Sequence, residues 1–75
     1  GIYVLNNKPL SELAKTLERR YNVIIDFEDP ELKDYSYTGV LKDLTLDQML
    51  NALKLTAQIE YTINEREVKL YKHKN

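Results

Sequence analysis

The stretch that most constrains this chain is residues 45–63, where the hydrophobic period changes from that of a helix to that of a strand. Its first part carries apolar residues at helical spacing, which predicts an amphipathic helix: Leu46, Met49, Leu50, Leu53 and Ala57. Thr45 and Gln48 fit a capping box at the start of this helix. Residues 59–63 then alternate apolar and polar side chains, as a half-buried strand does. One helix and one strand cannot bury both apolar faces alone, so this unit needs a partner.

A second unit of the same kind lies 36 residues earlier in the chain. Two unrelated strand–helix–strand segments could also align, but the matching lengths of strand, loop and helix favour an internal repeat. We therefore predict an α+β fold built from two βαβ repeats in the order β-α-β-β-α-β-β, with one shared core. The aligned positions are Val4-Leu5 with Val40-Leu41; Leu10, Leu13, Ala14 and Leu17 with Leu46, Met49, Leu50 and Leu53; and Val23, Ile25 and Phe27 with Ile59, Tyr61 and Ile63.

Turn and capping residues divide the rest of the chain into short elements. We expect a first helix over residues 10–21, ended by Asn22 in a left-handed conformation. A single turn is expected to begin at Pro30 and to be capped by Asp29, and residues 6–9 carry turn chemistry. The predicted strands occupy residues 2–5, 23–27, 35–41, 59–63 and 68–71.

Length and composition limit the classes of protein to consider. The chain has 75 residues, which is enough for a single domain over residues 1–75. The net charge is −1 with acidic and basic residues interleaved, so neither nucleic acid nor an anionic membrane is favoured as a partner. No stretch approaches the ~20 apolar residues of a membrane span. Because the sequence begins with Gly1 and enters a strand at once, we expect a fragment of a longer chain that carries any membrane or targeting segment elsewhere.

The sequence contains no arrangement of residues that predicts catalysis, so we expect no enzyme, no cofactor and no metal site. The single histidine, His73, lies in a lysine-rich stretch, residues 72–75, which we expect to be a solvated tail. Ser11 and Ser36 have no histidine partner in the pattern. The carboxylates between residues 26 and 34 lack the spacing and the central glycine of a calcium loop.

Three blocks of sequence resemble the C-terminal domain of FecR-type anti-sigma factors from Bacteroidetes. The blocks are PLSELAKTLERRYNVIIDFEDPEL, YTGVLKDLTLDQMLNALKLT and IEYTINEREVKLY, and the resemblance runs from about Val4 to Tyr71. Its most telling parts are LERRYNV with the acidic DPEL turn, and Thr38-Gly39 followed by LTLDQML. These are packing and turn motifs, so they indicate a family more than a mechanism.

The resemblance implies both a fold and a role. FecR C-terminal domains are similar to the short N-terminal (STN) signalling domain of secretins and TonB-dependent transducers, which implies two helices packed between two small sheets. By the repeat, we pair the first and third strands in one sheet and place the second, fourth and fifth strands in the other. FecR-like proteins cross the inner membrane once. Their cytoplasmic part binds an ECF sigma factor, and their periplasmic part reads an outer-membrane transducer in iron or glycan uptake. This fragment would be the periplasmic sensor.

We expect the transducer's signalling domain to bind at an open strand edge with tyrosines beside it, because tyrosines bring large contact area at low entropic cost. The candidate residues are Tyr35, Tyr37, Ile24 and Tyr71; the alternative is that these tyrosines cover the rim of a small core. Two other functions stay open. The chain could be the STN or secretin signalling domain of the outer-membrane protein itself, or a small-ligand regulatory domain. RNA binding is disfavoured, because the second strand, VIIDF, places an acidic residue outward.

Overall fold

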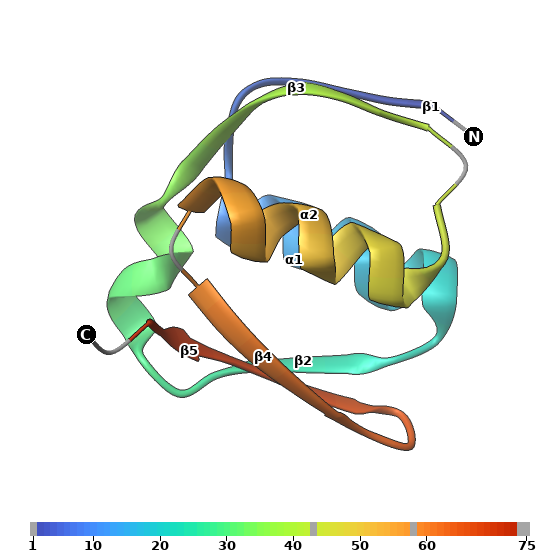
Figure 1. Ribbon diagram of the computed structural model, residues 1–75, viewed down its shortest axis with the longest axis vertical. Helices are drawn as coiled ribbons and strands as arrows, with labels where there is room; N and C mark the ends of the chain where they lie inside the picture. Colours follow the sequence, from blue (N-terminus) through green and yellow to red (C-terminus); the bar gives the residue numbers. More distant parts are fainter. Residues whose placement is uncertain (1, 43, 58, 74–75) are drawn as a thin grey trace.

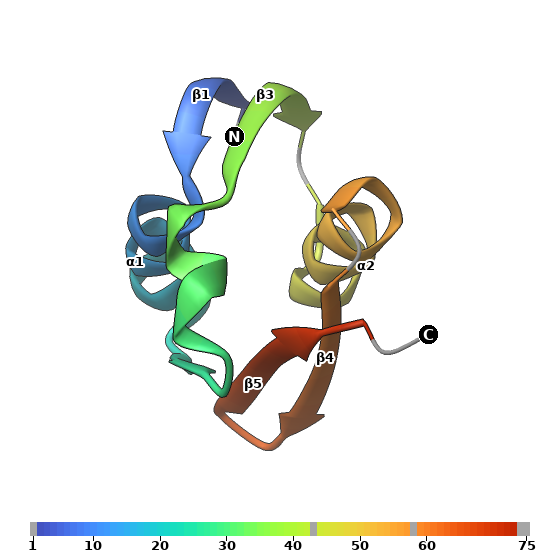
Figure 2. The same ribbon diagram turned by 90° about the vertical axis from the view of Figure 1, so that its left-hand side faces the viewer.

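Two helices form a layer between two β-sheets, as Figures 1 and 2 show from two directions. The computed structural model describes residues 2–42, 44–57 and 59–73. The two-stranded sheet, here sheet A, has the order β1-β3, and the three-stranded sheet, here sheet B, has the order β2-β5-β4. This arrangement confirms the predicted α+β class and the predicted strand pairing. The elements are β1 Ile2–Pro9, α1 Leu10–Tyr21, β2 Ile24–Phe27, the 3₁₀ helix η1 Pro30–Asp34, β3 Ser36–Lys42, α2 Leu46–Ala57, β4 Ile59–Asn64 and β5 Glu67–Lys72.

The pairing in sheet A reflects the internal repeat. β1 and β3 are antiparallel, and Val4 lies opposite Val40, its equivalent in the other repeat. The two helices run in opposite directions across the molecule (Figure 1). Both features are those of two units related by an approximate two-fold axis that passes near the Val4–Val40 pair.

In sheet B the two repeats do not pair directly. β5, which belongs to neither repeat, lies between β2 and β4 and is parallel to β2 and antiparallel to β4. Val68 of β5 therefore has Ile25 on one side and Ile63 on the other. The extra strand joins the two halves into one sheet and supplies two buried side chains, Val68 and Leu70.

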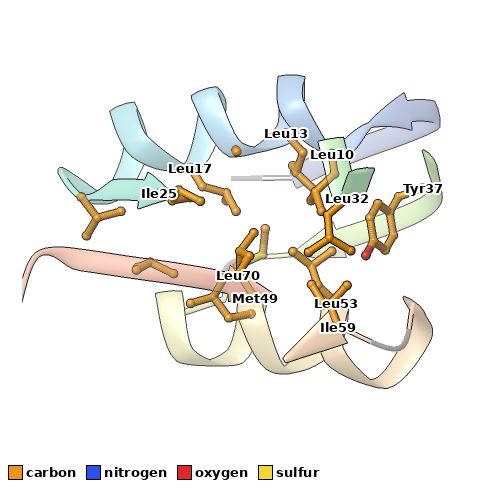
Figure 3. Close-up of a cluster of buried hydrophobic side chains, with 14 of the residues drawn as sticks. Leu10, Leu13, Leu17, Ile25, Leu32, Tyr37, Met49, Leu53, Ile59 and Leu70 are labelled. Atoms are coloured by element: carbon orange, nitrogen blue, oxygen red, sulfur yellow. The ribbon is translucent and has the colours of Figure 1, made fainter. Parts of the chain in front are cut away.

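The core between the layers is apolar, and no polar or charged residue in the described part of the chain is buried. Figure 3 shows side chains from both helices, both sheets and η1 meeting in it. The helix positions predicted by periodicity are buried: Leu10, Leu13, Ala14 and Leu17 of α1, and Met49, Leu50 and Leu53 of α2. Leu32 of η1 is fully buried, which attaches this short turn to the core.

Local capping signals agree with the predictions at both helices. The Thr45 N–H donates to Gln48 Oε1 at 3.0 Å, and the Gln48 N–H donates to Thr45 Oγ1 at 3.2 Å, which forms the capping box. Asn22 ends α1 in the left-handed conformation, with φ 54°. Helix α1 has Pro9 at its N-cap position and no side-chain cap.

Strand β1 is longer than predicted. Residues 6–9, expected to form a turn, continue the strand after a bulge between Leu5 and Lys8. Asn7 adopts φ 53° there, and its N–H donates to Thr38 Oγ1 at 3.0 Å. The turn residues in this stretch produce a bulge because pairing with β3 continues beyond them to the end of β1.

The end of β5 also differs from the prediction. The Asp29 side chain does not cap η1; its carboxylate accepts the Lys72 N–H at 2.7 Å. β5 extends to Lys72, which pairs with Ile59 of β4. The predicted tail therefore begins later, and His73 contacts the carboxylate of Glu60 on β4 instead of lying in solvent alone. These are long-range contacts, which local sequence patterns do not encode.

Candidate functional site

The outer face of sheet A exposes a row of apolar side chains. Val4 is 73% exposed and its cross-strand neighbour Val40 is 55% exposed. Ile2, two residues before Val4 on the same face, is 63% exposed. Clustered exposed aliphatic side chains are typical of a contact surface. The sequence pattern carried a signal for this face, because Val4-Leu5 and Val40-Leu41 must each direct one side chain outward. The candidate residues chosen from the sequence do not include it.

A groove lies beside this face, between β3 and α2. Its lining consists of residues 37–41 of β3, Leu5 of β1, and Ala52, Leu53 and Thr56 of α2, and its volume is about 230 Å³. We call it the β3–α2 groove. It contains no charged side chain. In Figure 2, β1 lies above α1, and β3 lies beside it on the side of α2. The edge of β3 that faces away from β1 therefore borders the groove.

Tyr37 forms part of the wall of the groove. It is only 8% exposed, and its hydroxyl has no hydrogen-bond partner among the described residues. Figure 3 shows the ring at the edge of the core with its hydroxyl directed toward α2. Burial, and next the nearby Tyr35, raise the pKa of Tyr37 to about 12. The phenol is thus protonated at neutral pH and holds an unused donor.

The four residues expected to contact a partner do not form one surface. Tyr37 is buried and Tyr35 is half-buried against the core at the start of β3. Ile24, 56% exposed, and Tyr71 lie on the outer face of sheet B, separated by four positions of β5, or about 13 Å. Of the four, only Tyr37 lines the groove. Partner binding by the set stays a prediction.

The outer face of sheet B is mostly polar. A shallow depression of about 300 Å³ includes Ile24, Asp26 and Lys69. Its charges of both signs distinguish it from the uncharged β3–α2 groove.

A small cluster of titratable groups lies on the surface around Glu60. Glu60 accepts hydrogen bonds from His73 and from Lys54, the latter at 3.2 Å. These bonds, that of His73 first, hold the pKa of Glu60 below its usual value. No group of three histidine, aspartate or glutamate side chains in the described ranges is arranged to hold a metal ion. What this surface offers chemically is apolar area and strand edges, which are means of binding.

No curated protein sequence matches the chain. Two crystal structures of a proposed anti-sigma factor from Parabacteroides distasonis ATCC 8503, at 1.65 Å and 2.50 Å resolution, match it with TM-scores of 0.88 and 0.87 and 30% sequence identity. The match covers 99% of this chain and 35% of theirs, so the chain spans about a third of their length.

Neither α1 nor α2, in the part of the chain that the structure describes, has the length and apolar character to cross a bilayer. The family model for the C-terminal part of FecR matches residues 2–70, almost the whole chain. The chain therefore belongs to the FecR C-terminal family.

Proposed function

We propose that this domain is the periplasmic sensor end of a FecR-type anti-sigma factor. It binds the signalling domain of an outer-membrane TonB-dependent transducer, and the contact regulates an ECF sigma factor that a cytoplasmic part of the same protein holds. The observation that carries the proposal is the family match over residues 2–70. The 30% identity to a proposed anti-sigma factor supports it.

The chemistry of the described surface supports a binding role. The exposed face of sheet A presents Ile2, Val4 and Val40, and the groove beside it is uncharged. Burying one aliphatic side chain contributes about 1.5–3 kcal/mol, which is enough to change an affinity more than tenfold. A small contact of this kind suits a reversible signal.

Regulation requires the domain to bind two states of the transducer with different affinities. A protein that binds both states equally shifts no equilibrium, however tightly it binds. We expect the signalling domain to present its binding segment in one state and to withhold it in the other. The sensor then binds or releases the transducer according to whether the transducer has bound its own ligand.

Isothermal titration calorimetry tests the proposal directly. The domain is titrated with the isolated N-terminal signalling domain of each TonB-dependent transducer from the source organism, and one of them is expected to bind. In cells, deletion of this domain from the full-length protein should uncouple sigma-dependent transcription from the inducing substrate. The proposal is wrong if no signalling domain binds and the deletion leaves induction unchanged.

A further inference from the structure

We propose that the partner adds an extended strand to the free edge of β3 and places one uncharged side chain in the β3–α2 groove. The inference rests on the proposed function, since it takes that strand to be a segment of the transducer's signalling domain. Addition of a strand at a sheet edge gives affinity through main-chain hydrogen bonds and specificity through side-chain pockets.

The other three edge strands in the described part of the chain are obstructed. β1 carries the bulge between Leu5 and Lys8. On β2, the Ile25 N–H points away from β5 and is already bonded to Glu18 Oε2 at 2.8 Å. β4 carries Glu60 with its charged neighbours. Bulges, edge charges and covering side chains are the devices that prevent strand addition.

Over residues 37–41, which line the groove, the edge of β3 carries no charged residue, and its exposed residues are not covered by another element. Thr38, Gly39 and Val40 are exposed. Gly39 has φ +154°, and no atom beyond Gly39 and its two chain neighbours lies within 4 Å of the position a Cβ would take, so another backbone can approach closely. In an antiparallel pair, successive residues direct their N–H and C=O groups alternately toward the partner and away from it. β3 therefore offers unpaired backbone groups on the groove side.

The groove determines the chemistry of the residue that enters it. Its lining is uncharged, which excludes a charged side chain because burial of an unpaired charge is costly. Leu5, Leu41 and Leu53 supply apolar contacts. The unpartnered hydroxyl of Tyr37 can donate to an acceptor on the incoming side chain. A short side chain with one acceptor, such as threonine or asparagine, satisfies both conditions.

Size separates this occupant from a small molecule and from a second copy. Pockets for small ligands measure about 300–1,000 Å³, and the groove measures about 230 Å³. A stable homodimer needs about 800 Å² per partner, roughly a sixth of the 5091 Å² surface of this domain. An edge of five residues with one groove is too small to bury the area that a stable homodimer needs. It suits a single added strand with one anchoring side chain.

Filling the groove from α2 tests the proposal. Thr56 lines the groove and is exposed, so Thr56→Phe should close the groove without unfolding the domain. We expect the affinity for the signalling domain to fall at least about tenfold, the loss of one buried side-chain contact. The matched control is Leu55→Phe, at the residue that precedes Thr56 on the same helix but lies outside the groove and is 77% exposed. It should leave the affinity unchanged.

Two further measurements complete the test. Tyr37→Phe removes only the hydroxyl, and it should weaken binding about three- to tenfold through the lost hydrogen bond. Amide hydrogen exchange in the complex should slow at whichever of the two neighbouring residues Gly39 and Val40 directs its N–H toward the groove. It should stay unchanged along β2 and β4.

The outcomes separate this inference from the proposed function. If the wild-type domain binds the signalling domain but Thr56→Phe binds equally well, or protection appears on another strand, the site is wrong and the proposed function stands. If the wild type binds no signalling domain, the proposed function fails first. If sedimentation shows a dimer that Thr56→Phe dissociates, the groove holds a second copy and the inference is overturned.

Discussion

At the scale of single residues, Tyr37 departs most from what packing alone would select. It contributes its ring to the core and keeps a buried hydroxyl without a partner among the described residues. An unsatisfied buried polar group costs about 1–3 kcal/mol. Phenylalanine would fill the same space without that cost, so the hydroxyl does not serve the stability of the free domain.

Tyr37→Phe should therefore leave the free energy of unfolding unchanged or raise it, measured by urea denaturation at neutral pH. Because burial raises the pKa of Tyr37 to about 12, from about 10 in the unfolded chain, folding favours the protonated phenol. Stability is thus fully present below pH 10 and declines between pH 10 and 12 as the unfolded state loses the proton first. The advantage of the variant over the wild type should grow across this window. A variant less stable than the wild type at neutral pH would contradict the argument.

At the scale of elements, the two helices start in different ways although they occupy equivalent places in the repeat. Helix α2 has the reciprocal Thr45–Gln48 capping box, whereas α1 follows Pro9 directly from β1 with no side-chain cap. Helix α2 therefore depends on its cap more than α1 does.

Thr45→Ala should lower the free energy of unfolding by about 1 kcal/mol, because an orphan N–H at the start of α2 loses its acceptor. Thermal unfolding followed by circular dichroism measures the loss. Thr45→Ser keeps the hydroxyl and should recover most of it. Equal losses in both variants would show that the methyl group, and not the cap, is responsible.

The edge of β2 depends on a side chain from α1. The Glu18 carboxylate accepts a hydrogen bond of 2.8 Å from the Ile25 N–H. This N–H would otherwise be unpaired at the edge of the sheet. Glu18→Ala should lower the free energy of unfolding by about 1–2 kcal/mol, measured by urea denaturation. Glu18→Gln retains an oxygen acceptor and should lose less. A Glu18→Ala domain as stable as the wild type would show that water replaces the carboxylate without cost.

At the scale of the whole molecule, the core has little reserve. From its 75 residues we expect a free energy of unfolding at the lower end of the usual range of about 5–15 kcal/mol. Leu17 and Leu53 are 1% and 2% exposed, one on each helix. Burial of either side chain therefore accounts for a large share of the total free energy of unfolding.

Leu17→Ala and Leu53→Ala should each lower the free energy of unfolding by about 2–5 kcal/mol, since each leaves a cavity between the sheets. Leu55→Ala, at a 77% exposed position of α2, should change it by less than about 0.5 kcal/mol. Chemical denaturation of the three variants measures the differences. Similar losses at Leu53 and Leu55 would mean that α2 does not pack as the structure shows.

Sequence patterns predicted the elements well, but they did not predict how deeply the candidate partner residues are buried. Met49, Leu50 and Leu53 are buried and Leu46 is partly buried against them, as the helical spacing indicates, since a helix with one apolar face must turn that face to the core. The partner residues were chosen by residue type and strand alternation, which do not show depth. Tyr37 was expected to be available to a partner, but it lies in the core because β3 curves over α2, and Tyr35 lies half-buried beside it.

By itself, the hydrophobic periodicity of the sequence determined the class of fold, the two repeats and the buried faces of both helices. These features follow from interactions within a few helical turns or along one strand. The tertiary structure alone decided where β5 inserts, that β1 bulges at Asn7 instead of turning, and that a groove opens between β3 and α2. Each of these depends on contacts between segments distant in the sequence, whose relative placement is set by the packing of the whole core.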